Sequence, residues 1–295
     1  MMVDEFLDYL RYEKNRSELT VDSYANDLKS FEAYFKGLDE QLTWQSVDAD
    51  VIRDWMEDMM DKGNSATSIN RRLSALRSFF RFALARRMVE RDPSRLIKGP
   101  KKSKPLPQFV KEDEMNRLLD DVVWGDSFEE VRTRTILMVF YETGIRLSEL
   151  VGLDDVSVDM EICQIRVLGK RRKVRLIPFG EELRHALYIY NKVKAQWVGQ
   201  SSGALFVTTD GERMNGGQVR YEVRRQLAKV STLHKRSPHV LRHSFATAML
   251  NHDAGLESVK KLLGHASLAT TEIYTHTTFE QLKRVYSKAH PRASL

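Results

Sequence analysis

The sequence predicts a mainly α-helical protein with one small β-hairpin, divided into two domains. Three observations predict this fold class. Apolar residues recur at helical spacing along most of the 295 residues, whereas strict alternation occurs only after Leu153. A segment rich in proline and lysine, residues 99–107, interrupts the helical pattern. A chain of this length is also long for a single hydrophobic core, which favours two domains.

Residues 1–98 are expected to form a helical domain. A first helix follows Thr20, a candidate N-cap, and stops at Gly37. A second helix begins near residue 47 or 50 and ends near residue 60. The third helix carries the clearest apolar stripe, made of Ile69, Leu73, Leu76, Phe80 and Leu84.

The third helix also carries an unusual concentration of positive charge. Between residues 71 and 87 there is no acidic residue but six arginines: Arg71, Arg72, Arg77, Arg81, Arg86 and Arg87. A solvated face and a phosphate-contacting face both account for this pattern. Because the whole chain carries a net charge of +6, we expect a polyanionic partner. The first four of these arginines are our candidates for contacts with a DNA backbone.

Residues 99–107 are expected to be a linker between the domains. Their prolines and glycine do not continue a helix. Three lysines, Lys101, Lys102 and Lys104, make the linker basic and are further candidates for phosphate contacts.

Residues 108–295 are expected to form a mixed, mainly helical second domain. Helices are predicted over residues 111–123, 128–142, 181–198, 216–229, 238–250, 256–263 and 270–274. Apolar residues alternate at Ile165 and Val167, and again at Val174, Leu176 and Pro178. The basic run 170–173 lies between the two stretches, so the pattern predicts a β-hairpin with a positively charged tip.

Four segments of this domain contain residues that suit phosphodiester cleavage: 143–146, 239–243, 263–265 and 274–276. The hydroxyl of Tyr274 is a nucleophile that can attack phosphorus. The guanidinium groups of Arg146 and Arg242 suit the charge on the non-bridging oxygens. Together these residues indicate an enzyme that cuts DNA.

Histidines complete the set of candidate catalytic residues. His239 and His265 are able to move protons or donate hydrogen bonds to phosphate oxygens. His239 and His243 also have the spacing of a zinc pair on one helical face, but no catalytic glutamate stands between them and no third ligand is evident. We therefore predict no metal and no cofactor.

The four segments resemble a known family when they are taken in order. Thr-Gly-Ile-Arg-Leu-Ser-Glu-Leu (143–150), His-Val-Leu-Arg-His-Ser-Phe-Ala-Thr (239–247) and Leu-Gly-His-Ala-Ser-Leu-Ala-Thr-Thr-Glu-Ile-Tyr-Thr-His (263–276) resemble the catalytic boxes of tyrosine recombinases, the phage integrase family. In length and layout the chain is similar to the Xer type, XerC or XerD. The resemblance implies a two-domain clamp around the duplex, with a helical SAM-like core-binding domain and an α+β tyrosine-recombinase catalytic domain.

The resemblance also implies a chemical role for each candidate residue. Tyr274 would attack the scissile phosphate, giving a 3′-phosphotyrosyl bond and a free 5′-hydroxyl. Arg146 and Arg242 would hold the non-bridging oxygens, and Glu149, one helical turn after Arg146, would orient it. His239 and His265 would handle protons and contact oxygen.

The general acid that protonates the leaving 5′-oxygen is expected on the hairpin tip. Lys170 is the candidate that the resemblance implies. This chain has Arg171 where Xer relatives tend to have a second glycine, so Lys173 remains a second candidate.

The implied role is that of a site-specific recombinase acting on double-stranded DNA. The resemblance implies a homo- or hetero-tetramer on two DNA sites, with residues 279–289 docking on neighbouring protomers, and a septal DNA translocase as a further partner. A terminal helix packed on its own domain would show the same amphipathic pattern. The absence of a leader or a membrane span in the sequence predicts a cytoplasmic, nucleoid-associated protein. Chromosome-dimer resolution at cell division is favoured, and a mobile-element integrase, a type IB topoisomerase and a silent DNA-binding regulator are the alternatives.

Overall fold

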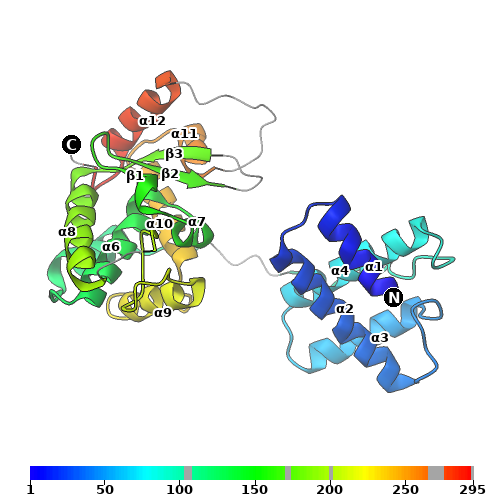
Figure 1. Cartoon of the computed structure of the whole chain (residues 1–295). Helices are drawn as coiled ribbons and strands as arrows, with labels where there is room; N and C mark the ends of the chain where they lie inside the picture. Colours follow the sequence, from blue (N-terminus) through cyan, green and yellow to red (C-terminus); the bar gives the residue numbers. More distant parts are fainter. Residues whose placement is uncertain (103–107, 170–173, 199–201, 265–275, 294–295) are drawn as a thin grey trace. The chain divides into compact units, whose positions relative to one another are not determined.

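The computed structural model describes residues 1–102, 108–169, 174–198, 202–264 and 276–293 (Figure 1). Its contacts divide the chain into two compact units, Met1–Pro105 and Leu106–Leu295. Each unit has hydrophobic core residues of its own. The architecture is mainly helical with one small sheet, as the sequence predicts.

The N-terminal unit is built from helices joined by short turns. They are α1 (Met2–Asp8), the π-helical turn η1 (Tyr9–Glu13), α2 (Glu18–Leu38), α3 (Ala49–Asp61) and α4 (Ala66–Ala85). The side chain of Asp48 caps α3 by accepting hydrogen bonds from the backbone N–H groups of Asp50 and Val51. Ser65 caps α4 by accepting from the N–H of Ser68 at 3.2 Å. These caps fix the first residues of α3 and α4, and α3 has bounds close to those predicted from the sequence.

Two details of this unit differ from the sequence-based expectation. Helix α2 begins after Ser17 rather than Thr20, and Gly37 lies inside the helix instead of ending it. On α4, Leu84 is 40% exposed, while Phe79 and Phe82 are buried. The reason is tertiary: Phe6 of α1 packs against both phenylalanines, with ring centroids 5.6 and 5.5 Å apart, which turns the buried stripe of α4 toward α1.

The C-terminal unit combines short and long helices with one antiparallel sheet. Its helical elements are α5 (Glu112–Asn116), η2 (Arg117–Asp121), α6 (Phe128–Thr143), α7 (Leu147–Val151), η3 (Asp155–Ser157), α8 (Glu181–Val198), α9 (Gly216–Leu227), α10 (Pro238–Asn251), α11 (Leu256–Leu263) and α12 (His276–Ala289). The predicted helix 111–123 is present as α5 and η2. The predicted helix 270–274 lies outside the described residues.

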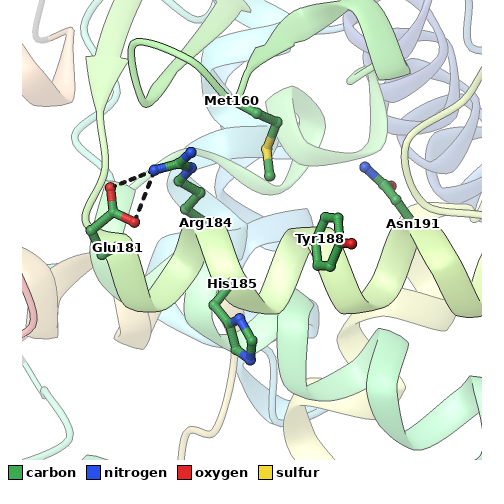
Figure 2. A pocket seen from close by; sticks show the side chains of 6 residues that line it. All are labelled: Met160, Glu181, Arg184, His185, Tyr188 and Asn191. Carbon is green, nitrogen blue, oxygen red and sulfur yellow. Dashed lines mark hydrogen bonds and ion pairs between the residues drawn. The ribbon is translucent and has the colours of Figure 1, made fainter.

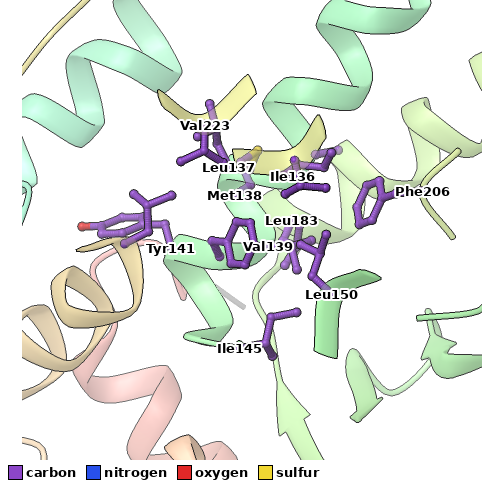
Figure 3. Packing of buried hydrophobic residues seen from close by; sticks show 14 of the residues in the cluster. Ile136, Leu137, Met138, Val139, Tyr141, Ile145, Leu150, Leu183, Phe206 and Val223 are labelled. Carbon is purple, nitrogen blue, oxygen red and sulfur yellow. The ribbon is translucent and has the colours of Figure 1, made fainter. Parts of the chain in front are cut away.

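Helix α6 forms the centre of this unit. It packs against α8, α9 and α10, and its residues Ile136 to Tyr141 are all buried. Figure 3 shows Ile136, Leu137, Met138, Val139 and Tyr141 of α6 among other buried side chains, which include Leu183 of α8 and Val223 of α9. Because α6 is covered on all sides, its C-terminal end, which leads to Arg146, has a fixed position in the unit.

The sheet contains three antiparallel strands in the order β1 (Val158–Asp159), β2 (Gln164–Leu168) and β3 (Val174–Pro178). Strands β2 and β3 form the predicted hairpin, with Val167 opposite Arg175. The alternation in the sequence indicated Val174 and Leu176 for the apolar face of β3, and this was wrong. Val174 is 49% exposed, whereas Arg175 and Ile177 are buried. An arginine is buried here because it has an ionic partner, Glu149, described below.

The C-terminal helix α12 packs on its own unit, against α10, α11 and β3. Leu282, Tyr286 and Ala289 are buried in a cluster with Phe245 and Met249 of α10. In this single chain the amphipathic face of the terminal helix covers its own domain, and docking of residues 279–289 on a neighbouring protomer stays a prediction.

Buried polar contacts anchor the residues after and within α12. The Tyr286 hydroxyl donates to Oε2 of Glu142 at 3.3 Å, and Nε2 of His290 lies 3.2 Å from the carbonyl oxygen of Tyr141. Arg292 pairs with Glu182 at 2.6 Å and with Asp120. The chain end is thus attached to both α6 and α8.

The Glu142→Gln variant should become more stable relative to the wild type as the pH rises from 5 to 7. Burial raises the pKa of Glu142 well above its ordinary value, so the folded protein keeps a proton that the unfolded chain releases above pH ~4.5. The stability linked to this proton is present at low pH and is lost as the pH rises. The difference should grow by up to about 1.4 kcal/mol per pH unit, measured by urea unfolding.

Burial also lowers the pKa of His290, which is stacked on Tyr286, to about 3. Its contribution to the pH dependence of stability is present in both proteins and cancels in the difference. The matched control is Glu161→Gln on the exposed surface, which should show no such slope. A Glu142→Gln effect that is the same at pH 5 and pH 7 would contradict the raised pKa.

Candidate active site

A tight turn after α6 sets the position of the first candidate arginine. Helix α6 ends at Gly144, whose φ of 59° lies in the left-handed region. A Cβ at this position would lie 2.5 Å from Cδ1 of Phe245 and 2.9 Å from Cδ2 of Leu263, so the turn requires glycine. The chain then enters α7, with Arg146 as its N-cap residue.

Arg146 is held by Glu149, as the sequence predicts. Nη1 of Arg146 donates to Oε1 of Glu149 at 2.9 Å, and the backbone N–H of Arg146 donates to Oε2 at 2.7 Å. The second contact also satisfies a free N–H at the start of α7. The guanidinium remains partly exposed, with 39% of the side-chain surface accessible, so a ligand can reach it.

Arg242 approaches the same place from α10. It is 6% exposed, and its two Nη atoms donate to the carbonyl oxygens of Gly144 and Leu263, each at 2.6 Å. Burial, and then the charges of Arg146 and Arg175, lower the pKa of Arg242 to about 10. No carboxylate pairs directly with Arg242 among the described residues. An anion bound here would relieve the repulsion between these arginines.

Arg175 is a member of the site that the sequence-based analysis missed. It lies on β3, and its Nη1 and Nη2 donate to the two oxygens of Glu149 at 2.6 and 2.8 Å. Its Nε donates to the carbonyl oxygen of Leu262 at 3.1 Å. The only signal in the sequence was an arginine within the apolar alternation of a strand, next to a basic tip that drew attention to the lysines.

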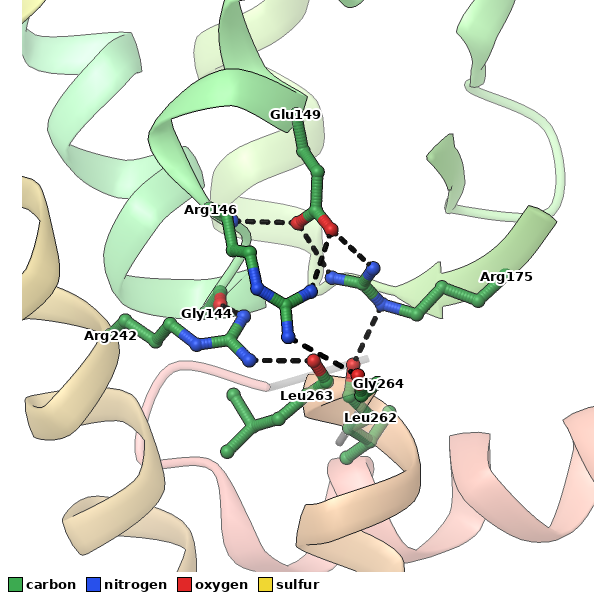
Figure 4. Close-up of polar contacts among 8 residues, drawn as sticks. All are labelled: Gly144, Arg146, Glu149, Arg175, Arg242, Leu262, Leu263 and Gly264. Carbon is green, nitrogen blue, oxygen red and sulfur yellow. Dashed lines mark hydrogen bonds and ion pairs between the residues drawn. The ribbon is translucent and has the colours of Figure 1, made fainter. Parts of the chain in front are cut away.

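The three arginines meet at the C-terminal end of α11 (Figure 4). The carbonyl oxygens of Leu262, Leu263 and Gly264 accept hydrogen bonds from Arg175, Arg242 and Arg146, respectively. The negative end of the helix dipole suits this arrangement. Among the described residues, three guanidinium groups face one carboxylate, that of Glu149, which leaves a net charge of +2. The cluster is therefore suited to bind a phosphate.

His239 and His243 of α10 lie on either side of Arg242 in the sequence, and their rings meet edge to face. The rings of His239 and His243 are 4.7 Å apart at an interplanar angle of 68°. His239 is exposed in the first turn of α10. Burial, followed by the charges of His239 and Arg242, lowers the pKa of His243. His239 is thus the one of the pair that is open to a ligand.

Three predicted site residues, Lys170, His265 and Tyr274, lie outside the described residues, as does the alternative acid Lys173. Their chain neighbours are described. Leu168 and Val174 are the last and first residues of the hairpin strands, and Gly264 is the last described residue before His265. Gly264, with a φ of 64°, is also the residue whose carbonyl oxygen accepts from Arg146.

The candidate DNA contacts of the N-terminal unit divide into two groups. Arg71 donates to Ser23 at 2.7 Å and pairs with Asp27, Arg72 lies 3.9 Å from the same carboxylate, and Arg77 donates to the carbonyl oxygen of Ile97. Arg71 is itself exposed. Arg81, Lys101 and Lys102 are exposed as well, while Lys104 lies outside the described residues. The paired arginines are held by the fold, which restricts their side chains without removing their charge.

A separate surface depression on α8 differs from the arginine cluster in its charge. It has a volume of about 340 Å³ and is lined by Met160, Glu181, Arg184, His185, Tyr188 and Asn191 (Figure 2). Glu181 and Arg184 pair with each other at 2.9 Å. Their charges cancel, so the depression lacks the positive potential of the arginine cluster.

Comparison with known proteins defines the class of protein to which this fold and site belong. Residues 108–281 match the phage integrase family, and residues 3–87 match the phage integrase N-terminal SAM-like domain. The first match includes Arg146, Glu149, Arg175 and Arg242. The chain therefore belongs to the phage integrase family and is a tyrosine recombinase.

Individual relatives are similar over nearly their whole length. The tyrosine recombinase XerC of Azotobacter vinelandii is 40% identical over 99% of this chain and 96% of its own. The tyrosine recombinase XerC of Chlorobaculum tepidum is 37% identical over 98% and 94%.

A solved structure shares the fold: the XerH site-specific recombinase bound to palindromic difH substrate has a TM-score of 0.72 at 22% identity, covering 97% of this chain and 84% of that one. Among the described helices, none has the length and apolar character needed to cross a membrane.

Proposed function

We propose that this tyrosine recombinase cuts and rejoins DNA at a specific site through a covalent 3′-phosphotyrosyl intermediate on Tyr274. The observation that carries the proposal is the arginine cluster. The positively charged arginines lie at the end of α11, directly before the segment that contains His265 and Tyr274 in the sequence. Arg146 and Arg242 hold the non-bridging oxygens, since their guanidinium groups are charged and have donors left for an anion.

Each chemical step then has a named group. The Tyr274 oxygen attacks phosphorus, the bond from phosphorus to the 5′-oxygen breaks, and Lys170 gives that oxygen a proton. His239 and His265 donate to phosphate oxygens or accept the tyrosine proton. The phosphotyrosyl link keeps the energy of the broken ester. A 5′-hydroxyl of another strand is thus able to reverse the attack and rejoin DNA without a nucleotide cofactor.

The biological setting that we propose is resolution of chromosome dimers at cell division. The curated relatives are named XerC, which favours this role over that of a mobile-element integrase. The recombinase would act in the cytoplasm at the nucleoid, as a homo- or hetero-tetramer on two DNA sites, with a septal DNA translocase as a further partner. Arg81, Lys101, Lys102 and the held arginines of α4 would contribute phosphate contacts from residues 1–107.

A trapping experiment tests the proposal. Genomic fragments that the protein retains in moderate salt identify the DNA site. On a version of that site nicked close to the scissile bond, cleavage releases the short fragment that carries the free 5′-hydroxyl. A covalent adduct should accumulate, and it should form equally well with EDTA, because arginines supply the charge that divalent ions supply in other nucleases. Failure to form any adduct on the retained site would refute the function. Dependence on added magnesium would refute the metal-free mechanism.

The Lys170→Ala variant should cleave ordinary DNA slowly and recover on DNA with sulfur in place of the bridging 5′-oxygen. An alkoxide is a poor leaving group without a proton, whereas a thiolate leaves without one. Single-turnover rates on the two substrates give the rescue. Lys173→Ala is the matched variant on the same hairpin and should show weaker binding with a smaller salt dependence, but no rescue. Rescue of Lys173→Ala alone would assign the acid to Lys173 instead.

A further inference from the structure

Arg175 connects three parts of the C-terminal unit that contribute to the proposed reaction. It lies on β3, the strand that follows residues 170–173, among them Lys170, in the sequence. It contacts both oxygens of Glu149 in α7 and the carbonyl oxygen of Leu262 at the end of α11. A buried arginine that uses a bidentate pair and a third bond in this way has a nearly fixed guanidinium plane.

The packing around Arg175 is close on the side of α11. A Cβ on Gly264 would lie 3.1 to 3.2 Å from Cδ, Nε and Nη1 of Arg175. The glycine that ends α11 therefore rests against the Arg175 side chain, and the carbonyl oxygen of the same glycine accepts from Arg146. Arg175 thus determines the position of a residue that Arg146 contacts.

Glu149 is shared by Arg175 and Arg146, and this sharing controls the charge of the site. Burial alone would raise the pKa of Glu149, but the hydrogen bonds and charges of Arg175, with those of Arg146, lower it to about 2. The carboxylate is thus ionised. Without Arg175, its full charge would fall on Arg146 alone, and the net charge of the cluster would drop from +2 to +1.

We propose that Arg175 is a positioning residue for DNA cleavage, which fixes Glu149 and Gly264 and so keeps Arg146 oriented toward the scissile phosphate and the cluster at its net positive charge. The inference rests on the proposed function, since it assigns Arg175 a part in the same phosphate site. Arg175 acts through Arg146 and Glu149 and needs no contact with DNA of its own.

The test compares Arg175→Gln with the wild type on two nicked substrates, under single-turnover conditions with saturating protein. One substrate has an ordinary scissile phosphate. The other has a methylphosphonate there, which lacks the negative charge that Arg146 serves. On phosphate the variant should be slower by about tenfold or more, a smaller loss than the ~10²–10³ typical of a direct donor. On the methylphosphonate the ratio of wild-type to variant rates should fall close to one.

Matched variants separate positioning from folding. Arg166→Gln removes an exposed arginine from β2 of the same hairpin and should leave both rates unchanged. Arg175→Lys keeps a positive charge without the bidentate pair and should show the same pattern in weaker form. If thermal melting shows that Arg175→Gln does not fold, the Arg175→Lys ratios decide the question by the same criterion.

Different outcomes would contradict the positioning role of Arg175 and the proposed function. A folded Arg175 variant that cleaves phosphate like the wild type, or that is equally slow on both substrates, would overturn the positioning role while the recombinase function stands. Absence of a covalent adduct with the wild-type protein on the phosphate substrate would instead overturn the proposed function itself.

Discussion

The Tyr274→Phe variant should bind the recombination site as tightly as the wild type and form no covalent adduct with it. The substitution removes only the phenolic oxygen, which is the atom that would attack phosphorus, and leaves the aromatic ring. The arginine cluster and the basic surface are untouched, so the phosphate contacts that provide affinity remain. Gel-shift titration and trapping on the nicked substrate measure the two properties on the same protein.

Tyr221→Phe is the matched control, because Tyr221 is an exposed tyrosine of α9 in the same unit. This variant should bind and form the adduct at the wild-type rate. An adduct formed by Tyr274→Phe would show that another residue is the nucleophile. Loss of binding by Tyr274→Phe, with normal behaviour of Tyr221→Phe, would assign Tyr274 a structural role instead.

Local pattern was sufficient to predict the bounds of one long and one short helix of the C-terminal unit. The bounds expected for residues 181–198 and 256–263 agree with α8 and α11, because both segments combine a sustained 3.6-residue period with clear end signals. For α11, Gly264 follows the last periodic residue and adopts the left-handed conformation of a helix end. The pairing of Glu149 with Arg146 was also predicted, since Glu149 stands one helical turn after the arginine.

The side chains that are buried, and the partners of the buried arginines, depend on tertiary contacts that no local sequence pattern contains. Leu84 matched the stripe of α4 but is exposed, because Phe6 from a distant helix determines which face is covered. Arg175 broke the apolar alternation of β3, and its burial becomes understandable only when Glu149, 26 residues away, is placed beside it. The contacts of Arg242 with Gly144 and Leu263 likewise join segments that are far apart in sequence.

The Arg242→Lys variant should lose cleavage activity by about 10²–10³ while it still binds the DNA site. The arginine donates to two carbonyl oxygens, those of Gly144 and Leu263, through different nitrogens. A single ammonium does not reach both and also hold a phosphate in a bidentate way. One buried carbonyl would lose its donor, which costs on the order of 1–3 kcal/mol of stability. Single-turnover cleavage with saturating protein gives the rate, and urea unfolding gives the stability.

The matched control is Arg132→Lys, which separates the two effects. Arg132 is a buried arginine of α6 in the same unit, and its Nη1 donates to the carbonyl oxygen of Val207 at 2.9 Å. It has no contact with the arginine cluster among the described residues. Arg132→Lys changes a buried arginine in the same way and should cleave close to the wild-type rate, whatever stability it loses. If both variants lost cleavage in proportion to their stability, Arg242 would be a structural arginine, and the phosphate would have to be held by other groups.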